Sequence, residues 1–252
     1  MKNFAIIFRH YFIRSIRFWQ TPVLLILLPL GLVTINMFGN GFVVGESNDP
    51  IMTLQASAIA TTFMIAFQFF SMEVVTNIIF EDLKGPVRWR LFMTPVPQRT
   101  FHAAVSAAGF MVTIVQGISI FGISALVFGA RIDNPLFFIT VFMIVAVIVQ
   151  LMGLIISQSA PTLRVASGIT YAICFGMMIF SGILFIPLGD SALATFVLSY
   201  GTPLALATRA IFYAGPILDN MNQAMINLSV LLAITLVLAV VYMILGRRRK
   251  TS

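Results

Sequence analysis

Residues 135–157 read PLFFITVFMIVAVIVQLMGLIIS, an apolar run that contains no charged residue. A helix needs about 20 predominantly apolar residues to cross the hydrocarbon core of a bilayer. The chain contains six apolar stretches of this kind, including this one. We expect membrane spans near residues 22–44, 52–78, 101–129, 135–157, 165–186 and 224–245. The expected fold is an all-α integral membrane protein, with one membrane domain over residues 1–252 and no soluble domain.

The composition supports lipid as the solvent of this protein. Of its residues, 60% are hydrophobic and 9% are charged, whereas soluble domains carry about 25% charged residues. A net charge of +7 could suit nucleic acid. The basic residues gather at the edges of the apolar stretches, however, which favours a role in topology and in contact with anionic headgroups.

The basic residues also predict the orientation of the chain. Read alternately, one set of connections is rich in lysine and arginine, and the other holds only Arg131 and Arg209. The rich set contains Lys2, Arg9, Arg14, Arg17, Lys84, Arg88, Arg90, Arg99, Arg164, Arg247, Arg248, Arg249 and Lys250. Because positive residues in short loops stay in the cytoplasm, we expect a multi-pass plasma-membrane protein with both termini cytoplasmic.

Two segments differ from simple spans. Residues 1–20 carry basic residues on one side of a helical wheel and mostly aromatic residues on the other, which predicts a helix in the cytoplasmic interface; a disordered basic leader is the alternative. Residues 187–218 contain two apolar pieces, 192–200 and 203–214, each too short to cross. We expect short re-entrant helices in the outer leaflet, with a plain external loop as the alternative.

The residues do not form a catalytic or metal-binding pattern. No P-loop, HExxH or GxSxG motif occurs, and the histidines, His10 and His102, are far apart. The single cysteine, Cys174, lies in an apolar stretch. We therefore expect no catalytic residue, no metal site and no cofactor in this chain.

A few polar residues fall inside the expected spans. They are Gln68, Glu73, Asn77, Gln116 and Gln150. Ionisable groups in a membrane are costly and often functional, so these residues are candidates for a translocation path. Interhelical hydrogen bonding explains the neutral ones equally well. Glu73 could also reach interfacial water or pair with a basic residue such as Arg17 or Arg99.

The connection over residues 81–99 is the most distinctive polar segment. It mixes charged and apolar residues, which predicts a short amphipathic helix over 86–93 that begins at Pro86. Pro95 and Pro97 would end this helix. Trp89, Leu91 and Phe92 would form an apolar patch that a cytoplasmic partner could cover.

This connection resembles the inner loop of ABC-transporter permeases of the type-2 exporter class. The shared pattern is ExxxGxxxxRLxxTPxxxR, carried by Glu81, Gly85, Arg90, Leu91, Thr94, Pro95 and Arg99. Residues 181–187 (SGILFIP) resemble the end of span five in that class, and 202–210 (TPLALATRA) resemble its re-entrant segment. The six-span layout agrees. Many members have threonine where this chain has Pro86, which could change the helix start.

The resemblance implies a bacterial or archaeal exporter of drug-, antibiotic-, lipid- or glycan-like substrates. Two permease copies, or this chain and a paralogue, would pair with two cytoplasmic ATPase subunits that bind ATP and Mg²⁺. This chain would then perform no bond chemistry. Residues expected to couple to the ATPase are Glu81, Gly85, Arg88, Trp89, Arg90, Leu91 and Pro95. Residues expected in the re-entrant segment and outer gate are Gly182, Pro187, Pro203 and Arg209.

Two other functions stay open from the sequence. One is an ion-coupled carrier or channel with Glu73 as the ion or proton site, although the inverted repeats typical of carriers are not evident. The other is a membrane scaffold that transports nothing. An amphiphilic substrate is expected because the spans offer few charged groups for an ion or sugar phosphate.

Overall fold

The computed structural model describes residues 2–17, 20–39, 50–85, 89, 93, 96–183, 191–216 and 218–248. Within these ranges the chain consists of helices and their connections, and no strand occurs. The principal elements, in chain order, are α1 (Lys2–Arg17), α2 (Gln20–Pro22), the π-helical turn η1 (Val23–Leu27), α3 (Leu28–Gly39), α4 (Pro50–Gln68), α5 (Ser71–Ile78), the π-helical turn η2 (Ile79–Leu83), α7 (Gln98–Phe128), α8 (Pro135–Ser159), α9 (Leu163–Phe180), α10 (Ala192–Tyr200), α11 (Pro203–Ala214) and α12 (Met221–Arg248).

The all-helical membrane fold expected from the sequence is confirmed. Five helical stretches of the described chain are long and apolar enough to cross a bilayer: Pro50–Asp82, Thr100–Phe128, Pro135–Ser159, Leu163–Phe180 and Met221–Gly246. A shorter apolar helix, Val23–Gly39, precedes them. The expected end of the first span falls within residues 40–49, outside the described residues.

The last part of the fifth expected span is not continuous helix. α9 ends at Phe180, and Gly182 adopts a left-handed conformation with φ of 74°. Glycine accepts positive φ without the steric cost that a side chain adds. Residues 184–190, which include the end expected at 186, lie outside the described residues.

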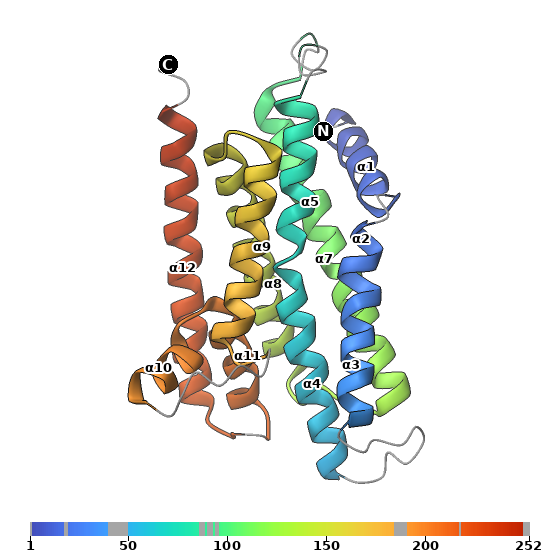
Figure 1. Ribbon diagram of the computed structural model, residues 1–252, viewed down its shortest axis with the longest axis vertical. Coiled ribbons are helices and arrows are strands. Elements are labelled where there is room, and N and C mark those ends of the chain that lie inside the picture. Colours follow the sequence, from blue (N-terminus) through green and yellow to red (C-terminus); the bar gives the residue numbers. More distant parts are fainter. Residues whose placement is uncertain are drawn as a thin grey trace.

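The helix pair α4 and α5 forms the centre of the bundle (Figure 1). α3 and α7 lie on one side of this pair, and α8, α9 and α12 lie on the other. The α4–α5 stretch is almost entirely buried, whereas α12 is almost entirely exposed. The polypeptide therefore has its core around α4 and α5, and α12 presents an apolar surface to lipid or to another chain.

A tight turn separates α4 from α5 near the middle of this central stretch. The amides of Phe69 and Phe70 bond to carbonyls three residues earlier, Ala66 and Phe67, at 3.3 and 3.2 Å. Phe70 then packs edge-on against Phe175 of α9, with ring centroids 5.6 Å apart. Such i→i−3 bonds mark a local departure from α-helical geometry, and here they separate α4 from α5 at the point where Phe70 contacts α9.

The segments that carry the basic connections gather at one end of the bundle, called here the basic end. It comprises α1, η2, the α8–α9 connection and the last turn of α12 (Figure 1, top). Arg131 lies at the opposite end, in a pocket that α11 also lines. The separation of charge seen along the sequence is therefore a separation in space.

The structure agrees with two further sequence expectations about local helices. α1 is helical over Lys2–Arg17 rather than a disordered leader; its position in the membrane interface stays a prediction. α10 and α11 have the predicted bounds. The Thr202 hydroxyl accepts a bond from the Ala205 amide at 3.1 Å, and Pro203 occupies the first turn of α11, the arrangement that favours a helix start.

Candidate functional site

The segment expected to meet an ATPase begins at η2, which follows α5 at the basic end of the bundle. The α4–α5–η2 stretch is called the central helix below. Here η2 carries Glu81 and Asp82, and Arg14 reaches them from α1. One Arg14 nitrogen lies 2.7 Å from both Asp82 oxygens, and the other lies 2.5 Å from Glu81 Oε2. Charge-assisted bonds of this kind are roughly twice as strong as neutral ones. The arginine therefore ties α1 to the end of the central helix.

The contact also acts on the pKa of its arginine and of a neighbouring tyrosine. Burial alone would lower the pKa of Arg14, but the carboxylates of Asp82 and Glu81 outweigh it and raise the pKa. Tyr11, one turn before Arg14, is buried beside the same site. Burial first, and then the charge of Asp82, raise the pKa of the Tyr11 hydroxyl. The phenol thus stays protonated and adds no negative charge.

Lys84 ties the same helix end to the other side of the bundle. Its Nζ donates to the Ala160 carbonyl at 2.9 Å, just beyond the end of α8. The ammonium also lies 4.1 Å from the ring centre of Phe80. A cation at a helix C-terminus is favoured by the partial negative charge of the unpaired carbonyls. The helix end is consequently held by α1 on one side and by α8 on the other.

Gly85 follows these contacts at a position where a side chain does not fit. A Cβ built on Gly85 would lie 2.1 Å from the backbone oxygen of Glu81. Trp89 is helical and 56% exposed, and the Met93 amide bonds to its carbonyl at 3.1 Å. The other residues expected to couple, Arg88, Arg90, Leu91 and Pro95, lie outside the described residues, as does most of the predicted helix over 86–93.

Glu73 projects from α5, two turns before Glu81, and it is only 8% exposed. Its Oε1 accepts from the Ser167 hydroxyl at 2.7 Å and from the Asn77 amide at 3.2 Å. Its Oε2 is buried and has no hydrogen-bond partner among the described residues. Pairing with Arg17, one of the alternatives that the sequence left open, is not what the structure shows: α9 brings Ser167 against this face of α5 instead. The Arg99 side chain lies outside the described residues.

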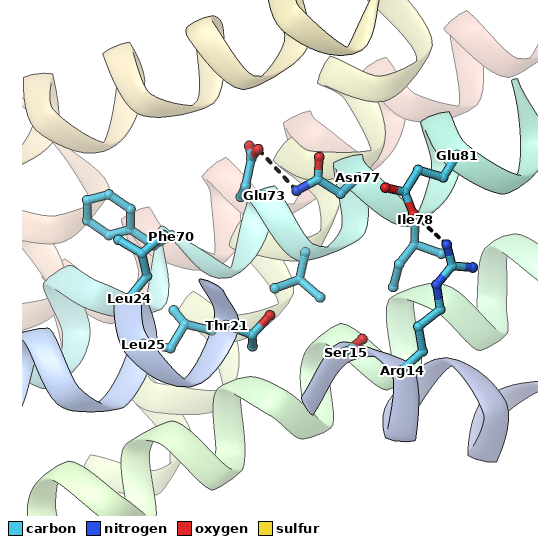
Figure 2. Close-up of a pocket in the computed structure, with 11 residues that line it drawn as sticks. Arg14, Ser15, Thr21, Leu24, Leu25, Phe70, Glu73, Asn77, Ile78 and Glu81 are labelled. Atoms are coloured by element: carbon cyan, nitrogen blue, oxygen red, sulfur yellow. Dashed lines mark hydrogen bonds and ion pairs between the residues drawn. The ribbon is translucent and has the colours of Figure 1, made fainter. Parts of the chain in front are cut away.

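Glu73 and Asn77 lie at the edge of a pocket between α5 and the N-terminal helices (Figure 2). α1 contributes Arg14 and Ser15, and the α2–η1 segment contributes Thr21, Leu24 and Leu25. Figure 2 shows the Arg14–Glu81 contact at one end of this pocket and Phe70 at the other. The pocket thus runs along α5 from the ion pair at the helix end into the apolar part of the bundle.

The three glutamines among the path candidates lie instead in the packed interior. Gln150 donates to the hydroxyls of Ser71 and Thr113 at 3.4 and 3.5 Å. Gln116 donates to the Met64 carbonyl at 3.2 Å, at the end of α4. Gln68 is fully buried, and both of its amide atoms lack partners among the described residues. All three lie near the α4–α5 turn, and Gln116 and Gln150 link neighbouring helices.

The residues expected at the outer gate come together in part. The Ser181 and Thr202 hydroxyls lie 2.7 Å apart, which joins the turn at Gly182 to the start of α11 at Pro203. The Arg209 guanidinium lies 5.6 Å from the ring centre of Tyr200, a cation–π contact. Pro187 lies outside the described residues.

Sequence reasoning did not find the most specific of these contacts. The sequence pattern places Arg14 on the basic face of the N-terminal helix and among the topology signals, and it gives no role to Ser167. Arg14 and Asp82 are separated by 68 positions, and Ser167 and Glu73 by 94. No local spacing links such pairs; covariation across related sequences is the signal that could reveal them.

The fold and the site together define a multi-pass helical membrane protein in which ion pairs and a lysine contact hold the end of the α4–α5 stretch at the basic end. A family model described as the ABC-2 type transporter matches residues 3–215. The chain belongs to this family: it is a membrane permease subunit of an ABC transporter, which has no ATPase activity of its own and carries no cofactor. A comparison with curated proteins gives no match. Among the described residues, no group of three or more His, Cys, Asp or Glu could hold a metal ion.

Proposed function

We propose that this chain is the membrane subunit of an ATP-driven exporter. It would move an amphiphilic drug-, antibiotic-, lipid- or glycan-like molecule out of the cytoplasm or the inner leaflet. Membership of the ABC-2 family supports transport driven by a separate ATPase, since permeases of this family generally pair with such subunits. We propose two ATPase copies and a second permease, which is this chain or a paralogue.

The observation that carries the proposal is the double attachment of the helix end before the inner connection. Arg14 joins it to α1, and Lys84 joins it to the end of α8. We propose that the basic end faces the cytoplasm and that the ATPase seats on residues 81–99. A displacement of this segment would then reach α1, α5 and α8 together, because ion pairs and hydrogen bonds resist separation.

The membrane path in this proposal runs along α5. Glu73 and Asn77 border the pocket beside that helix, so motion of the helix end would change the pocket directly. Near the α4–α5 turn, the hydrogen bonds of Gln116 and Gln150 would exchange as the helix changes shape, and the amide of Gln68 would gain partners. At the opposite end, the contact of Ser181 with Thr202 would hold the outer gate closed.

The test is recovery of the tagged chain from native membranes in mild detergent, followed by mass spectrometry of the bound proteins. We expect an ATPase in about equal amount. Trp89→Asp should abolish that recovery, because it places a charge on the exposed apolar surface proposed to meet the partner. Trp89→Phe should retain it.

A matched control makes the same chemical change at the other end of the molecule. Leu218 is 47% exposed and lies between α11 and α12, so Leu218→Asp should leave ATPase recovery unchanged. A wild-type chain recovered with no ATPase would contradict the proposal and favour a carrier or a scaffold. Equal recovery with Trp89→Asp would remove the docking role from residues 81–99.

A further inference from the structure

The pocket beside α5 has the kind of wall that ligand sites have. It is partly open to its surroundings. Sites for small organic molecules are lined mainly by apolar side chains with few polar groups. The apolar wall consists of Leu24, Leu25, Phe70, Val74 and Ile78.

The charged groups at this pocket leave an excess of negative charge. Among the described residues, three charged side chains line it: Arg14, Glu73 and Glu81. One positive charge against two carboxylates gives a formal sum of −1 (+1 − 2), and Asp82, outside the lining, also binds Arg14. Because Arg14 is already engaged by Glu81 and Asp82, it offers little attraction to an anion. The site is therefore matched to a cation.

Glu73 supplies a specific counter-ion for such a cation. Both of its donors, Ser167 and Asn77, are neutral and use Oε1. The buried Oε2 has no partner among the described residues, and an unpaired buried acceptor is costly. Figure 2 shows Glu73 and Asn77 on the same edge of the pocket, with Phe70 further along α5. A bound cation would compensate the carboxylate, and the Phe70 ring could contribute a cation–π contact.

We propose that this pocket binds a hydrophobic organic cation, with its apolar body against the leucines and its charge beside Glu73. The inference rests on the proposed function and deepens it, since it narrows the amphiphilic substrate to molecules that carry a positive charge. Entry from the inner half of the membrane fits the position of the pocket between α5 and the N-terminal helices.

The test compares two probes of the same shape and opposite charge, tetraphenylphosphonium and tetraphenylborate. Binding to the purified full-length chain in nanodiscs is measured by equilibrium dialysis. We expect the wild type to prefer the cation. Glu73→Gln should weaken cation binding on the order of tenfold, the change that corresponds to about 1.4 kcal/mol, and should not weaken the binding of the anion. Leu24→Trp, which fills the pocket, should weaken the binding of the cation as well.

Matched controls separate the pocket from general effects. Asp133→Asn removes an acid at the opposite end of the bundle, and Leu27→Trp adds the same bulk at a side chain that is 63% exposed. Both should bind the cation like the wild type. Unchanged cation affinity in Glu73→Gln, preference for the anion, or a phospholipid that occupies the pocket and excludes the cation would overturn the proposal.

The result of the dialysis experiment does not depend on the result of the ATPase recovery experiment. Dialysis needs no ATPase, whereas the recovery experiment needs no substrate. If the chain binds the cation but no ATPase is recovered with it, the proposed cation site stands and the proposed exporter function is rejected. If the ATPase is recovered but the chain shows no preference for the cation over the anion, the exporter function stands and the cationic substrate class is rejected.

Discussion

At the residue scale, the chain has few charged groups, and those at the end of the α4–α5 stretch bind oppositely charged or polar partners. Arg14, Asp82 and Glu81 neutralise one another in part at the end of the central helix, and Lys84 finds the carbonyl beyond α8. A charge near the hydrocarbon region is costly without such partners. The positions of these residues thus serve both topology and mechanical attachment.

The Arg14–Asp82 contact should be measurable as a coupling between two substitutions. Arg14→Met and Asp82→Asn, singly and together, should give an interaction energy on the order of 1 kcal/mol in the free energy of unfolding in detergent. The expected value is small because 35% of the Arg14 side chain is exposed and solvent screens the pair. If the effects of the two substitutions on the free energy of unfolding are additive, the Arg14–Asp82 contact does not stabilise the protein.

Arg9 provides the control for this cycle. It lies on the same helix, is exposed, and carries the same charge. Arg9→Met combined with Asp82→Asn should show no interaction energy. In membranes that also contain the ATPase, Arg14→Met should reduce substrate-stimulated ATP hydrolysis more than Arg9→Met does.

At the scale of elements, close approach of helices depends on small residues at a few positions. A Cβ on Gly109 of α7 would lie 2.5 Å from Gln150 Oε1 and 2.7 Å from Val75 Cγ2. Both of those side chains are buried in neighbouring helices, so neither has free space in which to move. Membrane helices pack through van der Waals contact at such small residues.

Alanine at Gly109 should therefore loosen the packing of α5, α7 and α8. We expect Gly109→Ala to destabilise the protein by about 1–3 kcal/mol, the usual range for overpacking, and to lower the melting temperature in detergent. Gly122 lies on the same helix, and a Cβ there meets nothing within 4 Å. Gly122→Ala should be neutral or slightly stabilising, because alanine favours helix. Equal melting temperatures for both variants would contradict this account.

At the scale of the whole molecule, the bundle is asymmetric in charge and in burial. The basic connections lie at one end, while α12 exposes most of its apolar surface along its length. Positive charge in short loops favours the cytoplasmic side. The arrangement supports an orientation with the basic end in the cytoplasm and leaves α12 for lipid or a second permease.

The orientation can be tested with single cysteines, because Cys174 is buried and should react slowly. Pro97→Cys lies before α7 at the basic end, and Asn220→Cys lies before α12 at the other end; both positions are exposed. A membrane-impermeant maleimide should label Asn220→Cys on intact cells and Pro97→Cys only after permeabilisation. The reverse pattern would invert the topology and exclude ATPase docking at 81–99.

Local patterns in the sequence were sufficient for most of the fold. Apolar length predicts the spanning helices, and Pro203 and Gly201 mark the break between α10 and α11. These features depend on residues close together in the chain, where backbone preference and transfer to lipid decide the outcome. The pattern over residues 81–99 identified the family for the same reason, since it is a continuous segment.

The candidate site depended on the tertiary structure. Sequence patterns were enough to predict a helical membrane bundle with its basic residues on one side and a distinctive connection over residues 81–99. Only the fold decided that Arg14 binds Asp82, that Ser167 rather than Arg17 meets Glu73, and that a pocket forms between α5 and the N-terminal helices. Those contacts join positions far apart in the chain, and their partners are chosen by how helices pack, which no local spacing records.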